Sequence, residues 1–198
     1  MSRMMRDQNV IEAADGRLGI LIPGLGAVAT TFIAGVEAIR RGLSQPIGSL
    51  TQMGHIRLGK RTEERNPLIK DFVPLQGLED VVFGGGDIIA DDCEVAARKA
   101  GVLEGPMIDQ LSSFLSEIKP MRAAFDQDYV KLLKGENVIP GTRRDWANQL
   151  RKDIQDFRTT HNLERIVVIW CGSTEAFCEQ SEVTATLAAF EAGLDADD

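Results

Sequence analysis

The stretch "IPGLGAVATTFIAG", residues 22–35, joins a short apolar run to a helix-like segment through a Gly-Leu-Gly turn. The apolar run, Leu18–Ile22, has the length and composition of a buried strand. Residues 27–41 are expected to form a helix, because two arginines and Gly42 give it a normal stop signal. A strand, a glycine turn and a helix in this order are typical of a dinucleotide-binding turn, and also of a plain bend between a strand and a helix.

If this turn binds a dinucleotide, its glycines have defined roles. Gly24 allows the tight turn, and Gly26 lets the backbone approach the pyrophosphate. Ala29 stands at the third position of the fingerprint, where alanine is accepted in place of glycine. The helix N-terminus adds free N–H groups and partial positive charge. The first candidate cofactor-binding residues are therefore Gly24 and Gly26.

Composition is that of a soluble globular protein and excludes some classes of partner. Hydrophobic residues make up 43% of the 198-residue chain and charged residues 26%, and both values are ordinary. The net charge of −8 argues against a nucleic-acid-binding surface, which draws mainly on lysine and arginine. No apolar run approaches the roughly 20 residues of a membrane span, and the polar start lacks a signal-peptide core. Three cysteines without metal-ligand spacing suit a reducing compartment, so we expect a cytoplasmic protein without a protein-built metal site.

Strand-like and helix-like segments alternate along the rest of the chain. Further strands are expected around 47–53, at 80–83 and at 165–170, the last as a buried strand. Further helices are expected at 91–101, at 105–120, after a capping pattern at Thr142 and Asp145, and from Ser181 onward. Such alternation predicts an α/β fold. We expect a Rossmann-like, doubly wound, mostly parallel sheet with helices on both faces, incomplete at the C-terminus.

The helix after Thr142 has the clearest pattern. Its apolar residues fall at helical spacing and form one stripe, made of Trp146, Leu150, Ile154 and Phe157.

One part of the dinucleotide fingerprint is missing from its usual place. An acidic residue about 20 residues after the turn normally binds the ribose, but no Asp or Glu lies between Glu37 and Glu63. The substitute is Asp87 in "FGGGDII", directly after the strand expected at 80–83. Because the carboxyl ends of parallel strands share one edge, Asp87 is expected near the glycine turn. A helix-capping role for Asp87 stays open as the alternative.

The loop "WCGSTE", residues 170–175, is a third candidate at the same edge. Gly172 lets backbone amides approach a ligand, and Ser173 and Thr174 offer hydroxyl groups to a phosphate or a nicotinamide. Alone, the loop is more typical of a Ser/Thr turn that caps the next helix. Three such loops at three strand ends together favour a nucleotide site.

Four segments together resemble the inositol-3-phosphate synthase family (myo-inositol-1-phosphate synthase) in a bacterial form. They are "LGILIPGLGAVATTFIAGVEAIRRG", "GSLTQMGHIRLGKRTEERNPLIKDFVPL", "VVFGGGDI" and "IVVIWCGSTE". The resemblance implies an NAD-binding Rossmann-like domain at 18–198, after a polar segment at 1–17. It also implies an NAD-dependent isomerase that converts D-glucose 6-phosphate into 1D-myo-inositol 3-phosphate by oxidation, intramolecular aldol cyclisation and reduction.

The resemblance also assigns roles to the candidate residues. The glycine-rich cofactor turn of the family corresponds to Gly24, Leu25, Gly26 and Ala27. Its Asp-Ile pair, which contacts the adenosine part of NAD, corresponds to Asp87 and Ile88. The family's Trp-x-x-Asn-Thr-Glu loop near the nicotinamide corresponds to residues 170–175, with Ser173 in place of Asn. The cofactor-binding set implied by the resemblance thus includes all three loops.

Two positions depart from the family pattern. Gly86 stands where a Trp usually precedes the Asp-Ile pair, and Ala176 replaces an Arg that commonly follows the Thr-Glu. Family members are also longer, with a lysine-rich catalytic and oligomerisation region beyond the matched part. The chain is therefore expected to be the NAD-binding part of a homo-oligomeric synthase, with no catalytic residue assigned and no turnover alone. A non-catalytic NAD-binding relic or regulatory protein is the alternative, followed by an ordinary NAD-dependent dehydrogenase.

Overall fold

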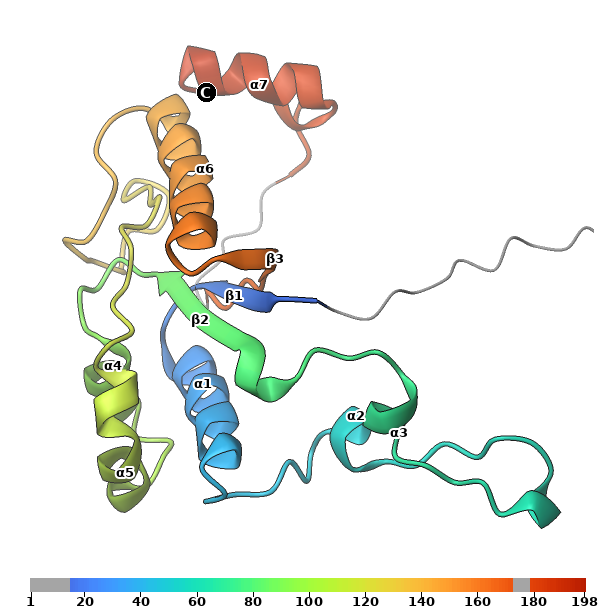
Figure 1. Cartoon of the computed structure of the whole chain (residues 1–198). Coiled ribbons are helices and arrows are strands. Elements are labelled where there is room, and N and C mark those ends of the chain that lie inside the picture. The colour runs from blue at the N-terminus through green and yellow to red at the C-terminus, as the bar shows by residue number, and fades with distance from the viewer. Residues whose placement is uncertain (1–14, 173–178) are drawn as a thin grey trace, which may run out of the picture.

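Three parallel strands form the centre of the protein in a computed structural model, which describes residues 15–172 and 179–198. β1 (Arg17–Pro23) lies in the middle, between β2 (Val81–Gly86) and β3 (Leu163–Val168), as Figure 1 shows. Because both pairings are parallel, the carboxyl ends of all three strands lie at the same edge of the sheet.

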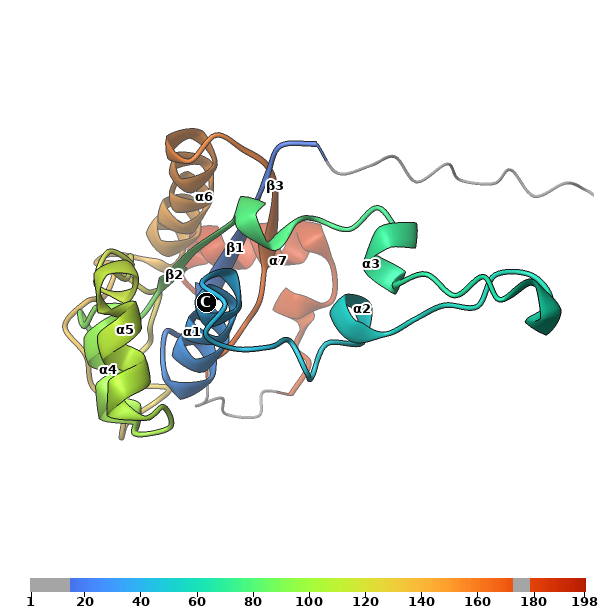
Figure 2. The same cartoon turned by 60° about the horizontal axis from the view of Figure 1, so that its bottom comes forward.

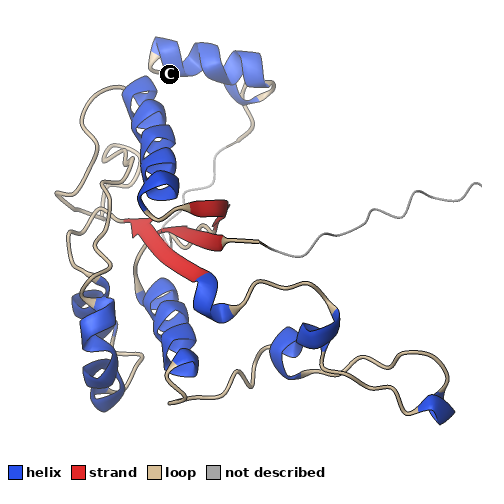
Figure 3. Ribbon diagram, viewed as in Figure 1, coloured by secondary structure: helices blue, strands red, loops and turns tan. Residues whose placement is uncertain are grey.

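Helices cover both faces of this sheet (Figures 1 and 3). On one face lie α1 (Ala27–Arg40), α4 (Cys93–Ala100) and α5 (Gly105–Leu115). On the other face lies α6 (Arg143–Thr160), against which α7 (Leu187–Ala196) packs. The arrangement confirms the predicted Rossmann-like α/β fold with a parallel sheet between two layers of helices. Within the described ranges, no helix combines the length and the apolar character needed to cross a membrane.

β1 contributes to two separate cores, because successive side chains of a strand point to opposite faces. Ile20 and Ile22 join α1, α4 and α5 in the larger core. Leu21 points to the other face and packs with Phe157 of α6. A Cβ atom on Gly84 would lie 2.7 Å from the Phe157 ring, so this glycine lets α6 pack directly on the sheet.

The chain leaves the sheet between α1 and β2, and residues 42–77 extend away from it (Figure 2). This excursion contains two short helical turns, α2 (Leu50–Met53) and α3 (Ile69–Phe72), and returns where Arg40 Nε donates to Leu78 O at 2.9 Å. Three 3-10 turns complete the described elements: η1 (Arg61–Glu63), η2 (Leu78–Asp80) and η3 (Glu182–Thr184).

The strand expected around 47–53 is wrong, since Leu50–Met53 is helical. Ile47 is 83% exposed and Leu50 74% exposed, so these apolar side chains are not buried in the sheet. Pro46 and Gly54 flank this short run and Gly48 lies within it, and such residues interrupt strand pairing. β2 is therefore the second strand along the chain as well as the neighbour of β1.

α6 begins as predicted, and its apolar stripe is buried only in part. The Asp145 carboxylate accepts from Thr142 N at 2.9 Å, and Asp145 N donates to Thr142 Oγ1 at 3.3 Å, which completes a capping box. Phe157 is 3% exposed, whereas Leu150 and Ile154 are 40% and 37% exposed. The C-terminal part of the helix therefore makes the contact with the sheet.

Two further elements near the C-terminus differ from expectation. β3 is the outer strand of the described sheet rather than a buried one, and about half of Val167 and Val168 is exposed. The final helix, expected to run on from Ser181, is split in two. Ser181 caps η3, and Thr186 starts α7 by accepting a hydrogen bond from Ala189 N at 3.1 Å. A second cap, the Thr186 side chain, thus starts a new helix after one 3-10 turn.

Cys93, the first residue of α4, has a buried thiol. Burial raises the pKa of Cys93 from 9.0 to about 12, and the nearby negative charges of Asp92 and Asp87 act in the same direction. Because the folded state holds this proton more tightly than the unfolded chain, the contribution of Cys93 to stability is lost as the pH rises from about 9 to about 12.

We expect a thiol-alkylating reagent near neutral pH to leave Cys93 unmodified in the folded protein and to modify it fully in denaturant. Mass spectrometry of the peptide that contains Cys93 measures this difference. Cys171, which is partly exposed, is the internal comparison. Rapid alkylation of Cys93 in the folded chain would contradict its burial.

Candidate functional site

The three loops that the sequence singles out start at one edge of the sheet, where α1 begins. Gly24 follows β1, Asp87 follows β2, and Gly172 comes shortly after β3. Gly24 N donates to Gly86 O at 2.8 Å, and Cys171 N donates at 2.8 Å to the carbonyl of the last residue of β1. These bonds hold the loops after β2 and β3 against the glycine turn, as the sheet-edge argument predicts.

Gly24 can only be a glycine in this arrangement, for two reasons. Its φ angle is +95°, a region that side chains of L-residues rarely adopt. A Cβ atom on it would lie 2.7 Å from both Cys171 C and Gly172 N. The turn and the loop after β3 are therefore packed backbone to backbone.

The N-terminus of α1 presents hydrogen-bond donors at the same edge. The first bond inside the helix runs from Thr30 N to Gly26 O at 3.0 Å, so the N–H groups of residues 27–29 have no partner within the helix. The first turn carries no acidic residue, and Gly26 makes no side-chain cap. A Cβ atom on Gly26 would meet no heavy atom of the described residues within 4 Å. Open space in front of a positive helix end suits an anionic group such as a diphosphate.

The Asp87 carboxylate is held directly at the glycine turn. Its Oδ2 atom accepts from Leu25 N at 2.8 Å, and its Oδ1 atom accepts from Ile89 N at 3.0 Å. Each carboxylate oxygen can accept a second hydrogen bond, which a ribose hydroxyl can supply. Asp87 does not cap the following helix, because Asp92 caps α4 by accepting from Val95 N at 2.9 Å. The helix-capping alternative is thereby excluded.

The position of Asp87 also explains the acid missing from its usual place in the sequence. Leu25 and Asp87 are 62 positions apart, against about 20 for the ribose acid in a typical dinucleotide fold. The excursion at 42–77 accounts for the difference, since β2 remains the direct neighbour of β1. Asp87 therefore stands at the end of the second strand, where such folds carry the ribose acid, and not after a third strand.

Of the other predicted site residues, some are placed by the structure and some lie outside the described residues. Leu25 and Ile88 are buried, at 2% and 7% exposure, so their side chains anchor the turn and the Asp87–Ile88 pair in the core. Gly172 is placed beside Gly24. Ser173 and Thr174, and with them Ala176, lie outside the described residues.

Comparison with known proteins identifies the family. The family model of the NAD-binding domain of myo-inositol-1-phosphate synthase matches residues 18–198. The chain belongs to this family. The expectation of NAD as the cofactor is thereby confirmed for the domain that the model describes.

Two relatives within the synthase family illustrate how much of the enzyme the chain spans. It is 45% identical over 186 residues to inositol-3-phosphate synthase 1 of Bacteroides thetaiotaomicron, covering 93% of this chain and 43% of that protein. It is 33% identical over 179 residues to inositol-3-phosphate synthase 1 of Bos taurus, covering 82% and 32%. The chain thus spans less than half the length of these synthases.

Solved structures show the same fold. The inositol-3-phosphate synthase of Caenorhabditis elegans superposes with a TM-score of 0.82 at 24% identity, covering 93% of this chain and 40% of that one. A myo-inositol-1-phosphate synthase-related protein of Thermotoga maritima gives a TM-score of 0.55 at 18% identity, covering 92% and 40%.

Sequence reasoning missed the segment that supports Asp87 in this synthase domain. Met121 N donates to Gly85 O at 2.9 Å, and Asp87 N donates to Met121 O at 3.2 Å. The Asn137 side chain then donates to Asp87 O at 2.8 Å. Residues 121–140 contain only isolated bridges and no helix or named strand, and no motif in the sequence marks Asn137.

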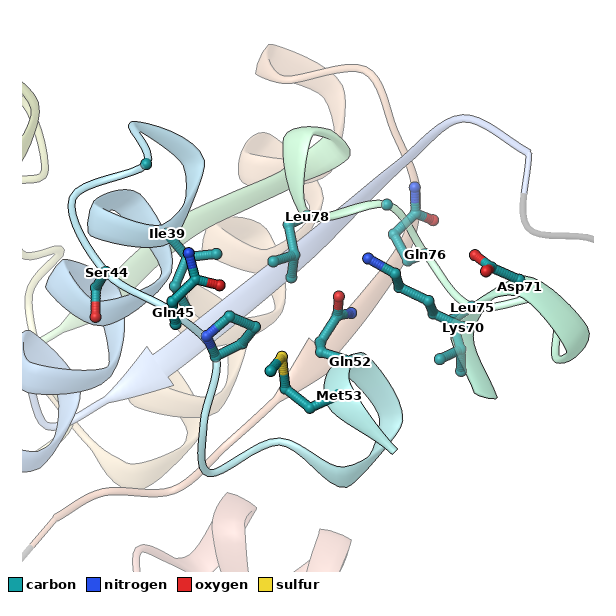
Figure 4. A pocket seen from close by; sticks show the side chains of 13 residues that line it. Ile39, Ser44, Gln45, Gln52, Met53, Lys70, Asp71, Leu75, Gln76 and Leu78 are labelled. Atoms are coloured by element: carbon teal, nitrogen blue, oxygen red, sulfur yellow. The ribbon is translucent and has the colours of Figure 1, made fainter. Parts of the chain in front are cut away.

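Two hollows on the described surface lie apart from the glycine turn. One, of about 450 Å³, lies between the end of α1 and the excursion and is lined partly by Met53, Leu75 and Leu78 (Figure 4). The other, of about 720 Å³, lies between α6 and the segment around Met121 and Ile139. Neither is lined by a residue of the glycine turn or of the Asp87–Ile88 pair. No group of three or more His, Cys, Asp or Glu residues suited to a metal ion occurs among residues 15–172 and 179–198.

Proposed function

We propose that this chain is the NAD-binding part of an inositol-3-phosphate synthase, an enzyme that isomerises D-glucose 6-phosphate to 1D-myo-inositol 3-phosphate. Membership of the family supports the proposal, and so does the geometry of the glycine turn. When bound, NAD supplies a hydride acceptor that takes a hydride from the substrate and later returns it. The observation that carries the proposal is the Asp87 carboxylate held at 2.8 Å from Leu25 N, at the end of the strand next to β1.

The chemistry of the donors and acceptors suits NAD. The N–H groups at the start of α1 would bind the diphosphate, and the open space beside Gly26 would let it approach the backbone. The Asp87 carboxylate would accept from the adenosine ribose, while the N–H group of Leu25 partly offsets its negative charge. Gly172 would leave room near the nicotinamide, and Ser173 and Thr174 stay predicted contacts there.

The proposed share of this chain in the reaction is to hold and orient NAD. We assign it no catalytic residue. Glucose 6-phosphate as the substrate, homo-oligomer formation and a cytoplasmic location are proposed for the enzyme on the strength of its family. These three proposals stay predictions.

Calorimetric titration with NAD+, using ATP as a control ligand, tests the proposal. We expect saturable binding of NAD+, and we expect Asp87→Asn to raise the Kd by about tenfold or more, because a charge-assisted hydrogen bond to the ribose is lost. Asn keeps the size of the side chain and one oxygen that can still accept from Leu25 N. This substitution therefore keeps an acceptor for Leu25 N, which Asp87→Ala would remove, and gives up the acceptor for Ile89 N.

Asp71→Asn is the matched control. Asp71 is an exposed aspartate on α3 in the excursion, away from the glycine turn (Figure 1), and the same charge is removed there. The Kd of the Asp71→Asn variant for NAD+ is expected to equal that of the unaltered chain. Absence of NAD+ binding by a folded chain, or equal Kd values for the two variants, would overturn the proposal. Net reduction of NAD+ by an external substrate would instead favour an ordinary dehydrogenase.

A further inference from the structure

Asn137 binds both peptide carbonyls of the Asp87–Ile88 pair. Its Nδ2 atom donates to Asp87 O at 2.8 Å and to Met121 O at 3.0 Å. Its backbone N donates to Ile88 O at 2.9 Å, and its own carbonyl accepts from Ala123 N at 3.0 Å. A single residue, 50 positions away in the chain, thus joins the pair to the neighbouring segment.

The contact between these two segments is close and fixes the orientation of the Asn137 amide. A Cβ atom on Gly135 would lie 2.2 Å from Ile88 O, so the backbone around Asn137 packs directly on the pair. Both side-chain partners of Asn137 are carbonyl oxygens, which only accept hydrogen bonds. The NH2 group must therefore face them, and its two hydrogens satisfy one carbonyl each.

These bonds hold the main chain of Asp87 in place. Asp87 N donates to Met121 O at 3.2 Å, and Asp87 O accepts from Asn137 Nδ2. With both main-chain groups held, only the two side-chain torsions of Asp87 decide where its carboxylate points. In the observed orientation the carboxylate reaches Leu25 N.

We propose that Asn137 is a positioning residue of the NAD site, acting through Asp87. It holds the Asp87–Ile88 pair in the orientation in which the carboxylate meets the Leu25 N–H group and faces the ribose. The proposal rests on the proposed function for its role in NAD binding, whereas its effect on the Leu25 N–H group does not depend on any ligand. No other common side chain offers two N–H donors on one nitrogen with so short a stem, because glutamine is one methylene longer.

Asn137→Asp is the sharpest test, since it keeps the shape and points carboxylate oxygens at two carbonyls. We expect the Kd for NAD+ to rise by about tenfold, through misplacement of Asp87. In the Asp87→Asn background the same substitution is expected to change the Kd by less than about twofold, because the group it acts through is already altered. Equal effects in both backgrounds would mean that Asn137 does not act through Asp87, and would overturn the proposal.

Amide hydrogen exchange at Leu25, measured by NMR without NAD, supplies the second readout. Asn137→Asp and Asn137→Ala are each expected to speed exchange of the Leu25 N–H group by about tenfold, because its acceptor is no longer held in place. Asn148→Asp on α6, an exposed asparagine with the same change of charge, is the control and should leave this rate unchanged. Unchanged Leu25 exchange in both Asn137 variants would overturn the proposal, even if NAD+ binds.

The two proposals fail in distinguishable ways. If the folded chain does not bind NAD+, the proposed function fails and, with it, the role of Asn137 in an NAD site. Faster Leu25 exchange would then still show that Asn137 orients Asp87. Thermal unfolding followed by circular dichroism identifies any variant that is unfolded. Asn137→Ala introduces no charge. If Asn137→Asp does not fold, Leu25 exchange is measured in Asn137→Ala alone.

Discussion

Replacing Gly24 with alanine is expected to destabilise the chain by about 3 kcal/mol or more. The φ angle of +95° at Gly24 is one that alanine adopts only with strain. The added Cβ atom would also lie 2.7 Å from Cys171 C and Gly172 N, and these are backbone atoms that cannot rotate away. For a chain of this size, the melting temperature should fall by about 6 to 12 °C, as measured by circular dichroism.

Gly26→Ala is the matched control, two positions along the same turn. Gly26 has a φ angle of −80°, and no heavy atom of the described residues lies within 4 Å of its Cβ position. The free energy of unfolding of the Gly26→Ala variant should fall by about 1 kcal/mol or less, the usual cost of alanine at a helix N-cap. NAD+ binding by this variant should nevertheless weaken, since the methyl group would occupy the space proposed for the diphosphate. Equal melting temperatures for the two variants would show that the loop after β3 does not pack on Gly24.

The glycine turn and α1 could be predicted because their signals are local. A strand, two glycines and a helix stop at Gly42 lie within one short stretch, and each element forms where the sequence indicates it. The position of Asp87 was also predicted, although the strand expected around 47–53 does not form. The sheet-edge argument needs only that Asp87 follows a strand parallel to β1, and it holds whether that strand is the second or the third.

Non-local contacts account for what the sequence did not predict. Asn137 is 50 positions from Asp87, and the bond between them depends on a segment with no periodic pattern. Leu150 and Ile154 also show that a local pattern does not predict tertiary contacts. Their helical spacing is correct, yet they stay more than one third exposed, because spacing determines which face a residue lies on and not what covers that face.

The run of three glycines at the end of β2 leads to the second large expected effect, a loss of about 3 kcal/mol for Gly85→Ala. A Cβ atom on Gly85 would lie 2.2 Å from Ile22 O and 2.7 Å from the Leu25 side chain. Gly85 does not have a positive φ angle, so the clash and not backbone strain is the physical cause. Urea-induced unfolding measures the loss as a lower transition midpoint.

Gly86→Ala is the control for this clash and also tests the departure from the family pattern. A Cβ atom on Gly86 would lie 3.5 Å from Met121 O, an ordinary contact, so stability should change by less than about 1 kcal/mol. The backbone at Gly86 therefore accepts a side chain, whereas one residue earlier it does not. A Gly85→Ala variant as stable as Gly86→Ala would mean that β1 and β2 do not approach this closely at their carboxyl ends. The register that pairs Ile22 with Gly85 also brings Asp87 to Leu25, so that result would remove the structural basis of the proposed NAD site.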